Sequence, residues 1–363
     1  MLASMQSIQS IQSIMPLWMA RSPVLVETVF FTVFILTLTI MLWWPKSHKT
    51  SQHAAPAIEL PALVQIRESD GKGMGMYATR DIEPGERIIA EPPLATSSHL
   101  QEEWVEEATS PRWREIFELS QNAMHGHKKT AMGVWLTNAI PADDGEGGHS
   151  FMIFKHVCRL NHDCRPNAHH GWNASTDKAT VHALRRVSRG EEITINYIHA
   201  QWDGTRKARQ RKLHSTFGFS CTCDHCSLSG AELKASDERQ RRLTSIESQL
   251  DNTETDVDML HGILVEQLEL MAAEGMPEIM GSGSMLSVVL ATPMAGKGVV
   301  AGQVQRASEW ASRGEACCRL ALGADSHEVG MFAALVPRFA KWNATHHHAA
   351  IARLLEERKR AKG

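Results

Sequence analysis

The sequence predicts an α+β protein with a β-rich middle, a helical C-terminal region and one transmembrane helix ahead of both. Short apolar runs separated by turn residues fill the middle of the chain, and apolar residues at helical spacing follow from residue 231. A long, almost uncharged apolar segment precedes them. The chain has 363 residues and a formal net charge of -3. It therefore lacks the basic excess of a nucleic-acid-binding surface, and we expect no direct nucleic-acid binding.

The apolar segment at residues 24–44, VLVETVFFTVFILTLTIMLWW, carries one charge, Glu27, near one end. At about 1.5 Å of rise per residue, a helix of this length spans roughly the 30 Å hydrocarbon core of a bilayer. A buried core helix is the alternative, but helices this uniformly apolar are rare in soluble domains. We therefore predict a membrane anchor here, between an N-terminal tail at 1–23 and a polar linker at 45–60.

The charges beside the apolar segment predict its orientation. Lys46 and Lys49 follow it, whereas Arg21 alone precedes it. The positive-inside rule then favours a single-pass protein whose main domain faces the cytosol. A mitochondrial presequence in the Gln-Ser-Ile repeats, or a nuclear or cytoplasmic location, is the alternative.

The middle of the chain alternates between strand and turn signals. Residues 62–69 and 86–94 are strand-like, and the glycine-rich residues 70–85 between them predict turns. Residues 100–136 favour helix. Residues 179–198 predict two short strands around a turn.

The C-terminal region, residues 229–363, is predicted to be helical. Its helical spacing is clearest in Val257, Leu260, Leu264, Leu268 and Met271. We find no chemistry in this region. The basic stretches 206–212 and 357–363 are typical of solvated helix faces.

Three cysteines, Cys221, Cys223 and Cys226, fall in the stretch CTCDHC. Such close spacing indicates a metal site in a reducing compartment rather than disulfides. Three thiolates leave a tetrahedral zinc site one ligand short. His225, a distant cysteine such as Cys164, or water are all candidates for the fourth position.

Two further stretches carry polar residues in unusual density. GKGMG, residues 71–75, lies between strands rather than ahead of a helix, which excludes a dinucleotide-binding fingerprint. Its glycines allow close approach of the backbone to a ligand. RLNHDCRPN, residues 159–167, places Asn161, His162 and Cys164 almost side by side.

Taken in order, four segments resemble a SET-domain lysine methyltransferase: GKGMGMYATRDIEPGERI, RLNHDCRPNAHH, GEEITINY and FGFSCTCDHC. The chain is most similar to fungal members of the SET-and-MYND class. It lacks the MYND finger, since no cysteine occurs between residues 95 and 150. The resemblance implies a knotted SET domain at 61–200, a post-SET zinc segment at 201–228 and a TPR-like helical region behind them.

The resemblance also implies two bound groups, S-adenosylmethionine and Zn²⁺. The cofactor-binding residues that it implies are Lys72, Gly73, Met74, Gly75, Asn138, Asn161, His162, Tyr197 and Phe219. It makes Cys164 the fourth zinc ligand. Tyr197 is implied as the catalytic residue, with its hydroxyl near the transferring methyl group, and it shares the substrate-lysine channel with Phe217. Many relatives have a second tyrosine at the position of Phe217, and this difference tends to alter how many methyl groups are added.

The resemblance implies transfer of methyl groups to lysine side chains of a protein substrate. The sulfonium methyl is already activated, so the protein mainly has to align it with a deprotonated amine. A catalytically weak interaction protein is the alternative, because Phe217 removes a hydroxyl from the channel. Methylation of a small molecule is a third reading. The sequence does not indicate an oligomeric state.

Overall fold

The structure is a computed structural model of the chain. It describes residues 59–96, 115–116, 118–119, 128–143, 149–198, 204–250, 256–292, 300–339 and 341, which all belong to one unit. The predicted anchor at 24–44 and its tail at 1–23 lie outside these residues, as does nearly all of the linker at 45–60. Among the helices that are described, none is long and apolar enough to cross a membrane.

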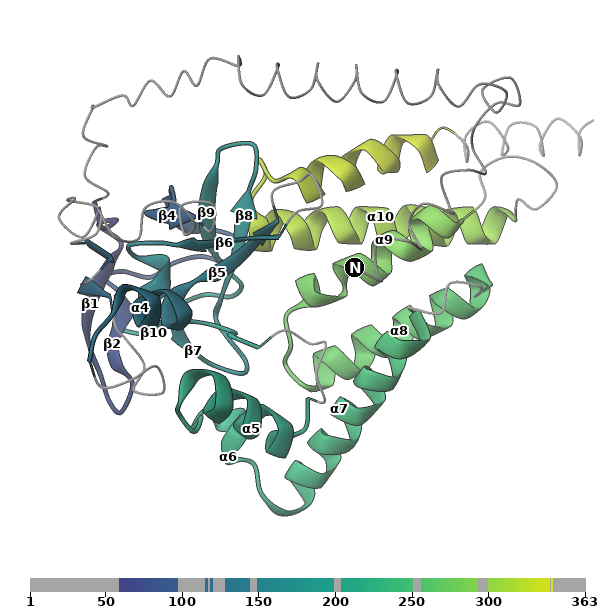
Figure 1. Cartoon of the computed structure of the whole chain (residues 1–363). Helices are drawn as coiled ribbons and strands as arrows, with labels where there is room; N and C mark the ends of the chain where they lie inside the picture. Colours follow the sequence, from purple (N-terminus) through teal and green to yellow (C-terminus); the bar gives the residue numbers. More distant parts are fainter. Residues whose placement is uncertain are drawn as a thin grey trace, which may run out of the picture. The chain divides into compact units, whose positions relative to one another are not determined.

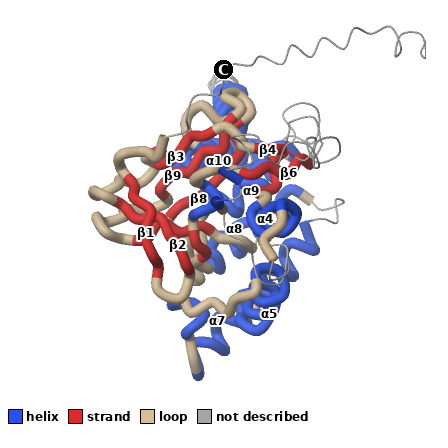
Figure 2. Tube along the Cα trace, turned by 60° about the vertical axis from the view of Figure 1, so that its left-hand side comes forward, coloured by secondary structure: helices blue, strands red, loops and turns tan. Residues whose placement is uncertain are grey.

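Within the residues that the structure describes, ten strands build the β-rich part (Figure 1). In chain order they are β1 (Val64–Ser69), β2 (Gly73–Ala78), β3 (Arg87–Glu91), β4 (Ala95–Thr96), β5 (Ile140–Asp143), β6 (His149–Ile153), β7 (Asn161–His162), β8 (Ala168–Asn173), β9 (Lys178–Ala183) and β10 (Glu192–Ile195). They form three small sheets with the orders β1-β2-β10-β7, β3-β9-β8 and β4-β6-β5. Figure 2 shows β1 beside β2 and β3 beside β9.

Strand β2 lies inside the segment that was predicted to form turns, so that prediction was wrong for residues 73–78. The turn itself is confined to residues 70–72, since Ser69 pairs with Gly73 across the β1–β2 hairpin. Met76 and Ala78 alternate into the core and are 0% and 1% exposed. The glycines around them hid this alternation in the sequence.

Strand β10 joins two distant parts of the chain. It pairs antiparallel with β2 and parallel with β7, with Thr194 opposite Asn161 and Ile195 opposite His162. The prediction of two strands within residues 179–198 is confirmed by β9 and β10. A parallel pair needs a long crossover, so the pairing carries residues 161–162 alongside the end of β10.

Helices dominate after residue 205. The α-helices are α4 (Ala131–Asn138), α5 (Arg206–Phe217), α6 (Asp224–Ser227), α7 (Gly230–Leu250), α8 (Val257–Ala273), α9 (Ser282–Ala291) and α10 (Ala301–Leu322), and residues 327–339 are helical as well. The described residues also include the 3-10 helices η5 (Val157–Arg159) and η6 (Glu278–Gly281). Only α4 and a few other residues of the helix predicted at 100–136 are described.

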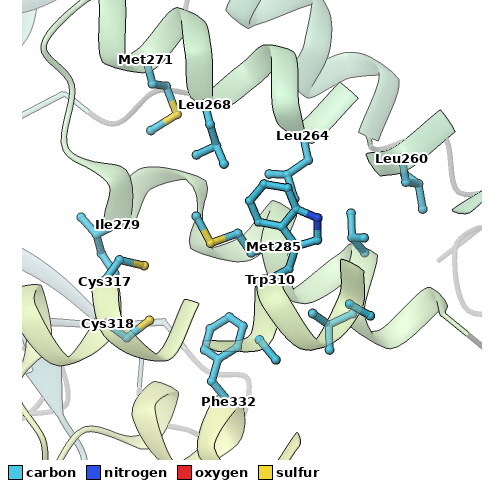
Figure 3. Close-up of a cluster of buried hydrophobic side chains, with 14 of the residues drawn as sticks. Leu260, Leu264, Leu268, Met271, Ile279, Met285, Trp310, Cys317, Cys318 and Phe332 are labelled. Atoms are coloured by element: carbon cyan, nitrogen blue, oxygen red, sulfur yellow. The ribbon is translucent and has the colours of Figure 1, made fainter. Parts of the chain in front are cut away.

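The helical region has a hydrophobic core of its own (Figure 3). Leu260, Leu264, Leu268 and Met271 are all buried on α8, which confirms the spacing prediction. Trp310 of α10 and Phe332 pack in the same cluster. Each buried Leu or Phe side chain stabilises the fold by about 1.5–3 kcal/mol.

The helical region is attached to the β-rich part through the end of α10. Helix α10 contacts β8 and β9. Beyond its last residue, the Asp325 carboxylate accepts a hydrogen bond from Arg87 of β3, and its backbone carbonyl accepts one from Ser175 at 3.0 Å. The two regions therefore share polar contacts as well as an apolar interface.

Candidate active site

A cavity of about 610 Å³ opens where the β1–β2 turn, α4, η5, β7, the end of β10 and the segment after α5 meet. Its volume lies within the range of ligand pockets. Its lining includes the following residues singled out from the sequence: Lys72, Met74, Asn138, Asn161, His162, Tyr197, Phe217 and Phe219. Gly73 and Gly75 do not line it. The cavity thus gathers residues that are up to about 150 positions apart in the chain.

Asn161 begins β7 and is held by two acceptors. Its Nδ2 donates to Glu192 Oε1 at 2.8 Å and to the carbonyl oxygen of Met74 at 3.3 Å. The side-chain amide therefore links the glycine-rich hairpin to β10.

Glu192 was not singled out from the sequence, although it stands in the quoted stretch GEEITINY. Its side chain is 16% exposed, and it accepts from Ser69 Oγ at 2.7 Å and from Lys72 Nζ at 2.9 Å, in addition to Asn161. One sequence signal could have indicated Glu192: it is a charged residue at the first position of a strand that lies beside a glycine-rich hairpin.

His162 is 4% exposed, and both of its ring nitrogens have protein partners. The backbone N–H of Tyr197 donates to Nδ1 at 3.1 Å, so the neutral ring carries its proton on Nε2, which lies 3.3 Å from Cys164 Sγ. Burial lowers the pKa of His162 to about 4, so the ring is neutral at physiological pH. His162 connects the cavity wall to the cysteine cluster.

Tyr197 follows β10 and points its hydroxyl at the 3-10 segment. Its Oη donates to the carbonyl oxygen of Leu160 at 2.5 Å. Burial raises the pKa of Tyr197, so the phenol stays protonated. Such a group acts as a fixed hydrogen-bonding dipole and not as a base.

Phe217 and Phe219 enclose Tyr197 in an aromatic cluster. Their ring centroids lie 5.0 Å and 6.4 Å from that of Tyr197. Helix α5 ends between them at Gly218, whose left-handed φ of 75° turns the chain so that both rings contact the tyrosine. The cavity wall beside the Tyr197 hydroxyl is therefore largely apolar.

Asn138 and Cys158 also line the cavity. Asn138 Nδ2 donates to Val134 O at 2.7 Å within α4, and Cys158 Sγ donates to the Asn138 carbonyl oxygen at 3.2 Å. Burial raises the pKa of Cys158 to about 12, so this thiol is not a nucleophile.

Four thiols form a cluster beside the cavity. The sulfur atoms of Cys164, Cys221, Cys223 and Cys226 all lie within 4.8 Å of one another. Four thiolates around one zinc ion at about 2.3 Å would sit roughly 3.8 Å apart, so this donor set fits Zn²⁺. His225, which the spacing left open as a ligand, instead places Nε2 at 2.9 Å from Glu274 Oε2. The structure therefore brings Cys164, and not His225, to the other three cysteines.

Arg209 supplies positive charge to this cluster. It is 6% exposed, and its Nη2 donates to the His225 carbonyl oxygen at 3.3 Å and to Cys226 Sγ at 3.8 Å. Hydrogen bonds from the neighbouring thiols, with the Arg209 charge, lower the pKa of Cys226. The interpretation of residues 206–212 as a solvated helix face was wrong for Arg209, because α5 turns Ala208, Arg209 and Leu213 inward.

Comparison with known proteins matches part of this chain to a protein family. Residues 73–198 match the family model of the SET domain. The chain contains a SET domain. The resemblance to SET-domain proteins is thereby confirmed, and most of the cavity lining belongs to residues 73–198 and to the segment that follows them.

Three curated proteins that are similar to this chain carry the same enzyme name. The histone-lysine N-methyltransferase set5 of Schizosaccharomyces pombe is 40% identical over 177 residues, which cover 47% of this chain and 53% of that protein. The histone-lysine N-methyltransferase ATXR4 of Arabidopsis thaliana is 40% identical over 91 residues, 25% of this chain and 27% of that protein. The histone-lysine N-methyltransferase SMYD1 of Homo sapiens is 33% identical over 85 residues, 20% and 17% of the two chains. The chain thus spans about half the length, or less, of these curated relatives.

Proposed function

We propose that the protein transfers methyl groups from S-adenosylmethionine to lysine side chains of a protein substrate. The observation that carries this proposal is the meeting of Asn161, Tyr197 and Phe219 on one cavity within a SET domain. The names of the three relatives reported above, each a histone-lysine N-methyltransferase, support the same reaction.

The cofactor end of the cavity is assigned to the polar residues and to one aromatic ring. S-adenosylmethionine, when bound, supplies a methyl group that the sulfonium charge has already activated. Lys72 and Asn161 offer a cation and an amide for its polar groups, and Phe219 offers a ring for the adenine. Asn138, Met74 and His162 complete the wall.

The lysine end is assigned to Tyr197 and Phe217. Their rings form an apolar wall that disfavours a charged amine and so lowers the pKa of an entering lysine. The Tyr197 hydroxyl is fixed by Leu160 and keeps its proton, so its role is to orient and polarise. Alignment of amine and methyl group is then the main source of rate.

The four thiols are assigned to one structural Zn²⁺. A closed site of four cysteines holds structure and leaves no position for substrate. The ion would tie Cys164, two residues after His162, to Cys221, two residues after Phe219. It would therefore hold the Phe219 wall against the cofactor site.

We also propose that residues 24–44 anchor the protein in a membrane, with the SET domain facing the cytosol. The sequence flanks support this orientation through Lys46 and Lys49. Histones are the first substrates to test because of the names of the relatives, and an anchored enzyme would reach them at the nuclear envelope. Cytosolic or membrane-proximal proteins are the other substrate class.

The test uses the full-length chain in mild detergent with methyl-labelled S-adenosylmethionine, core histones and, separately, a cell extract. Label on protein with the wild type, lost in Tyr197→Phe, supports the proposal. Label found only in the small-molecule fraction contradicts protein methylation. Binding of S-adenosylmethionine without any transfer would favour the interaction-protein alternative.

A further inference from the structure

One carboxylate underlies the cofactor side of the cavity without lining it. Glu192 accepts three hydrogen bonds, from Ser69 Oγ at 2.7 Å, Lys72 Nζ at 2.9 Å and Asn161 Nδ2 at 2.8 Å. These donors come from the end of β1, the hairpin turn and β7. A single carboxylate thus joins the β1–β2 hairpin to β7.

We propose that Glu192 is the positioning residue of the cofactor site: its carboxylate fixes the Asn161 amide and the Lys72 ammonium before S-adenosylmethionine binds. This inference rests on the proposed function, because Asn161 and Lys72 are its assigned cofactor contacts. Pre-organised groups raise affinity because their ordering has no cost at the moment of binding.

The hydrogen bonds of Asn161 define what Glu192 does to it. Both N–H groups are engaged, one by Glu192 and the other by the Met74 carbonyl oxygen. Only the amide oxygen is then left for a ligand, so Asn161 is set as an acceptor. Without the Glu192 charge, the Asn161 side-chain amide can rotate and present either its oxygen or its NH2 group to the ligand.

Gly75 gives an independent reason for this assignment. A Cβ at Gly75 would stand 2.4 Å from Glu192 Oε1 and 2.9 Å from Asn161 Nδ2, closer than real side chains allow. The glycine therefore makes room for the Glu192–Asn161 pair. This explains why Gly75 is a glycine even though it does not line the cavity.

The charge state agrees with this role. Burial raises the pKa of Glu192, but the hydrogen bonds from Asn161, Lys72 and Ser69 outweigh it and leave the pKa below its ordinary value. Glu192 is therefore ionised at neutral pH. The pKa of Lys72 is raised, since its bond to Glu192 outweighs its own burial.

The adjacent Glu191, directly before β10, is a matched control. Its carboxylate faces other partners, accepting from Asn167 Nδ2 at 3.0 Å, Arg185 Nη2 at 2.7 Å and the backbone N–H of Ser188 at 2.9 Å. It is as well bonded as Glu192, but it contacts no residue assigned to the cofactor. A purely structural role should make the two positions equally sensitive.

The experiment titrates S-adenosylmethionine into full-length wild type, Glu192→Gln and Glu191→Gln by calorimetry, and follows thermal unfolding of each. We expect Glu192→Gln to bind at least about tenfold more weakly, since hydrogen bonds to a charged group are lost. Glu191→Gln should bind within about twofold of the wild type, although its own bonds to a charged carboxylate are lost. The double variant Lys72→Met/Glu192→Gln should lose less affinity than the sum of the losses in Lys72→Met and Glu192→Gln, because interacting residues are not additive.

The outcomes separate the two levels of the proposal. If the wild type binds S-adenosylmethionine and Glu192→Gln binds it with the same affinity, the positioning role of Glu192 is overturned, whereas the proposed function is not. Equal losses of affinity in Glu192→Gln and Glu191→Gln, with equal losses of melting temperature, overturn it in favour of general stabilisation. A wild-type chain that binds no S-adenosylmethionine overturns the proposed function and this inference together.

Discussion

The Tyr197 hydroxyl donates a 2.5 Å hydrogen bond to the carbonyl oxygen of Leu160, one residue before Asn161. The backbone N–H of the same tyrosine donates to Nδ1 of His162. Tyr197 is thus held at both ends by the segment on which Asn161 and His162 stand. The same segment, residues 160–162, therefore carries two residues assigned to the cofactor and holds the proposed catalytic residue in place.

Replacement of Tyr197 by phenylalanine should lower methyl transfer about 100-fold or more, because a fixed dipole at the transfer site is lost. Affinity for S-adenosylmethionine should change little, since the ring remains in place. Steady-state transfer and calorimetry measure the two quantities. Tyr77→Phe is the control, because Tyr77 is the other tyrosine of the chain and lies under the Arg67 guanidinium, 3.8 Å from its ring centroid. A Tyr197→Phe enzyme of wild-type rate would remove the residue from the reaction.

Phe217→Tyr should change the proportions of mono-, di- and trimethyl-lysine. The Phe217 ring lies 5.0 Å from that of Tyr197, so a new hydroxyl would enter the apolar wall and could hold the amine or a water. Mass spectrometry of the methylated substrate gives the distribution. If the proportions stay as in the wild type, the lysine channel does not run past Phe217.

The purified chain should contain about one zinc ion, and Cys164→Ser should retain less than the wild type. Metal analysis by mass spectrometry checks both. Cys317→Ser is the control, because Cys317 is buried in the helical core, with its thiol donating to Gly314 O, away from the cluster. The zinc assignment fails if a carefully purified wild-type chain carries no zinc, or if the two variants retain it equally.

The sequence predicted the parts of the site that carry unusual residue types. The spacing of Cys221, Cys223 and Cys226 indicated a metal site, but it could not choose between Cys164 and His225. That choice depends on the parallel pairing of β7 with β10 and on Glu274, which draws His225 away. Contacts between segments this far apart have no local signal.

Other features were missed because ordinary residues make them. Glu192 and Arg209 belong to charged stretches that are typical of a solvated surface, yet folding buries most of one side chain and nearly all of the other. Strand β2 was missed because Gly73 and Gly75 favour turns locally, whereas pairing on both edges imposes a strand. Tertiary pairing overrode the local preference in that case.

Glu274→Gln should destabilise the protein by about 3 kcal/mol, because a fully buried carboxylate would lose its partners. Glu274 is 0% exposed and accepts from Ser236 Oγ at 2.7 Å, Arg239 Nε at 2.5 Å and Gln240 Nε2 at 3.1 Å. Urea denaturation measures the change. Glu266→Gln is the control, since Glu266 lies on the same region of chain but pairs with Arg242 at the surface, and should change stability little. Equal effects of the two variants would contradict a special role for the buried network.

The effect of Glu274 should depend on pH in a defined direction. Burial raises the pKa of Glu274, but hydrogen bonds from His225, Ser236 and Gln240 outweigh it, so the folded-state pKa lies below the ordinary value. The stabilisation is therefore complete above the unfolded carboxyl pKa of about 4.3 and is lost as the pH falls through the folded-state pKa. The difference between wild type and Glu274→Gln should narrow below about pH 4. A stability difference between wild type and Glu274→Gln that grows as the pH falls would contradict this prediction.

In sealed microsomes, a C-terminal tag should be digested by added protease, because the SET domain is proposed to face the cytosol. A tag that survives until detergent is added would place the domain on the luminal side. The sequon at Asn173 is a poor reporter of topology, since that side chain is 2% exposed, with Oδ1 accepting from Ser175 and Nδ2 donating to Asp325 O. An added sequon in the linker at 45–60 is the better glycosylation site.

The central claim is that this cavity moves a methyl group from S-adenosylmethionine to a lysine of a protein. The most direct measurement is tandem mass spectrometry of core histones and extract proteins after incubation with the full-length chain and cofactor carrying a heavy methyl group. We predict heavy methyl groups on lysine ε-nitrogens with the wild type and none above background with Tyr197→Phe. Heavy methyl groups on other atoms, or equal labelling by both chains, would contradict the account.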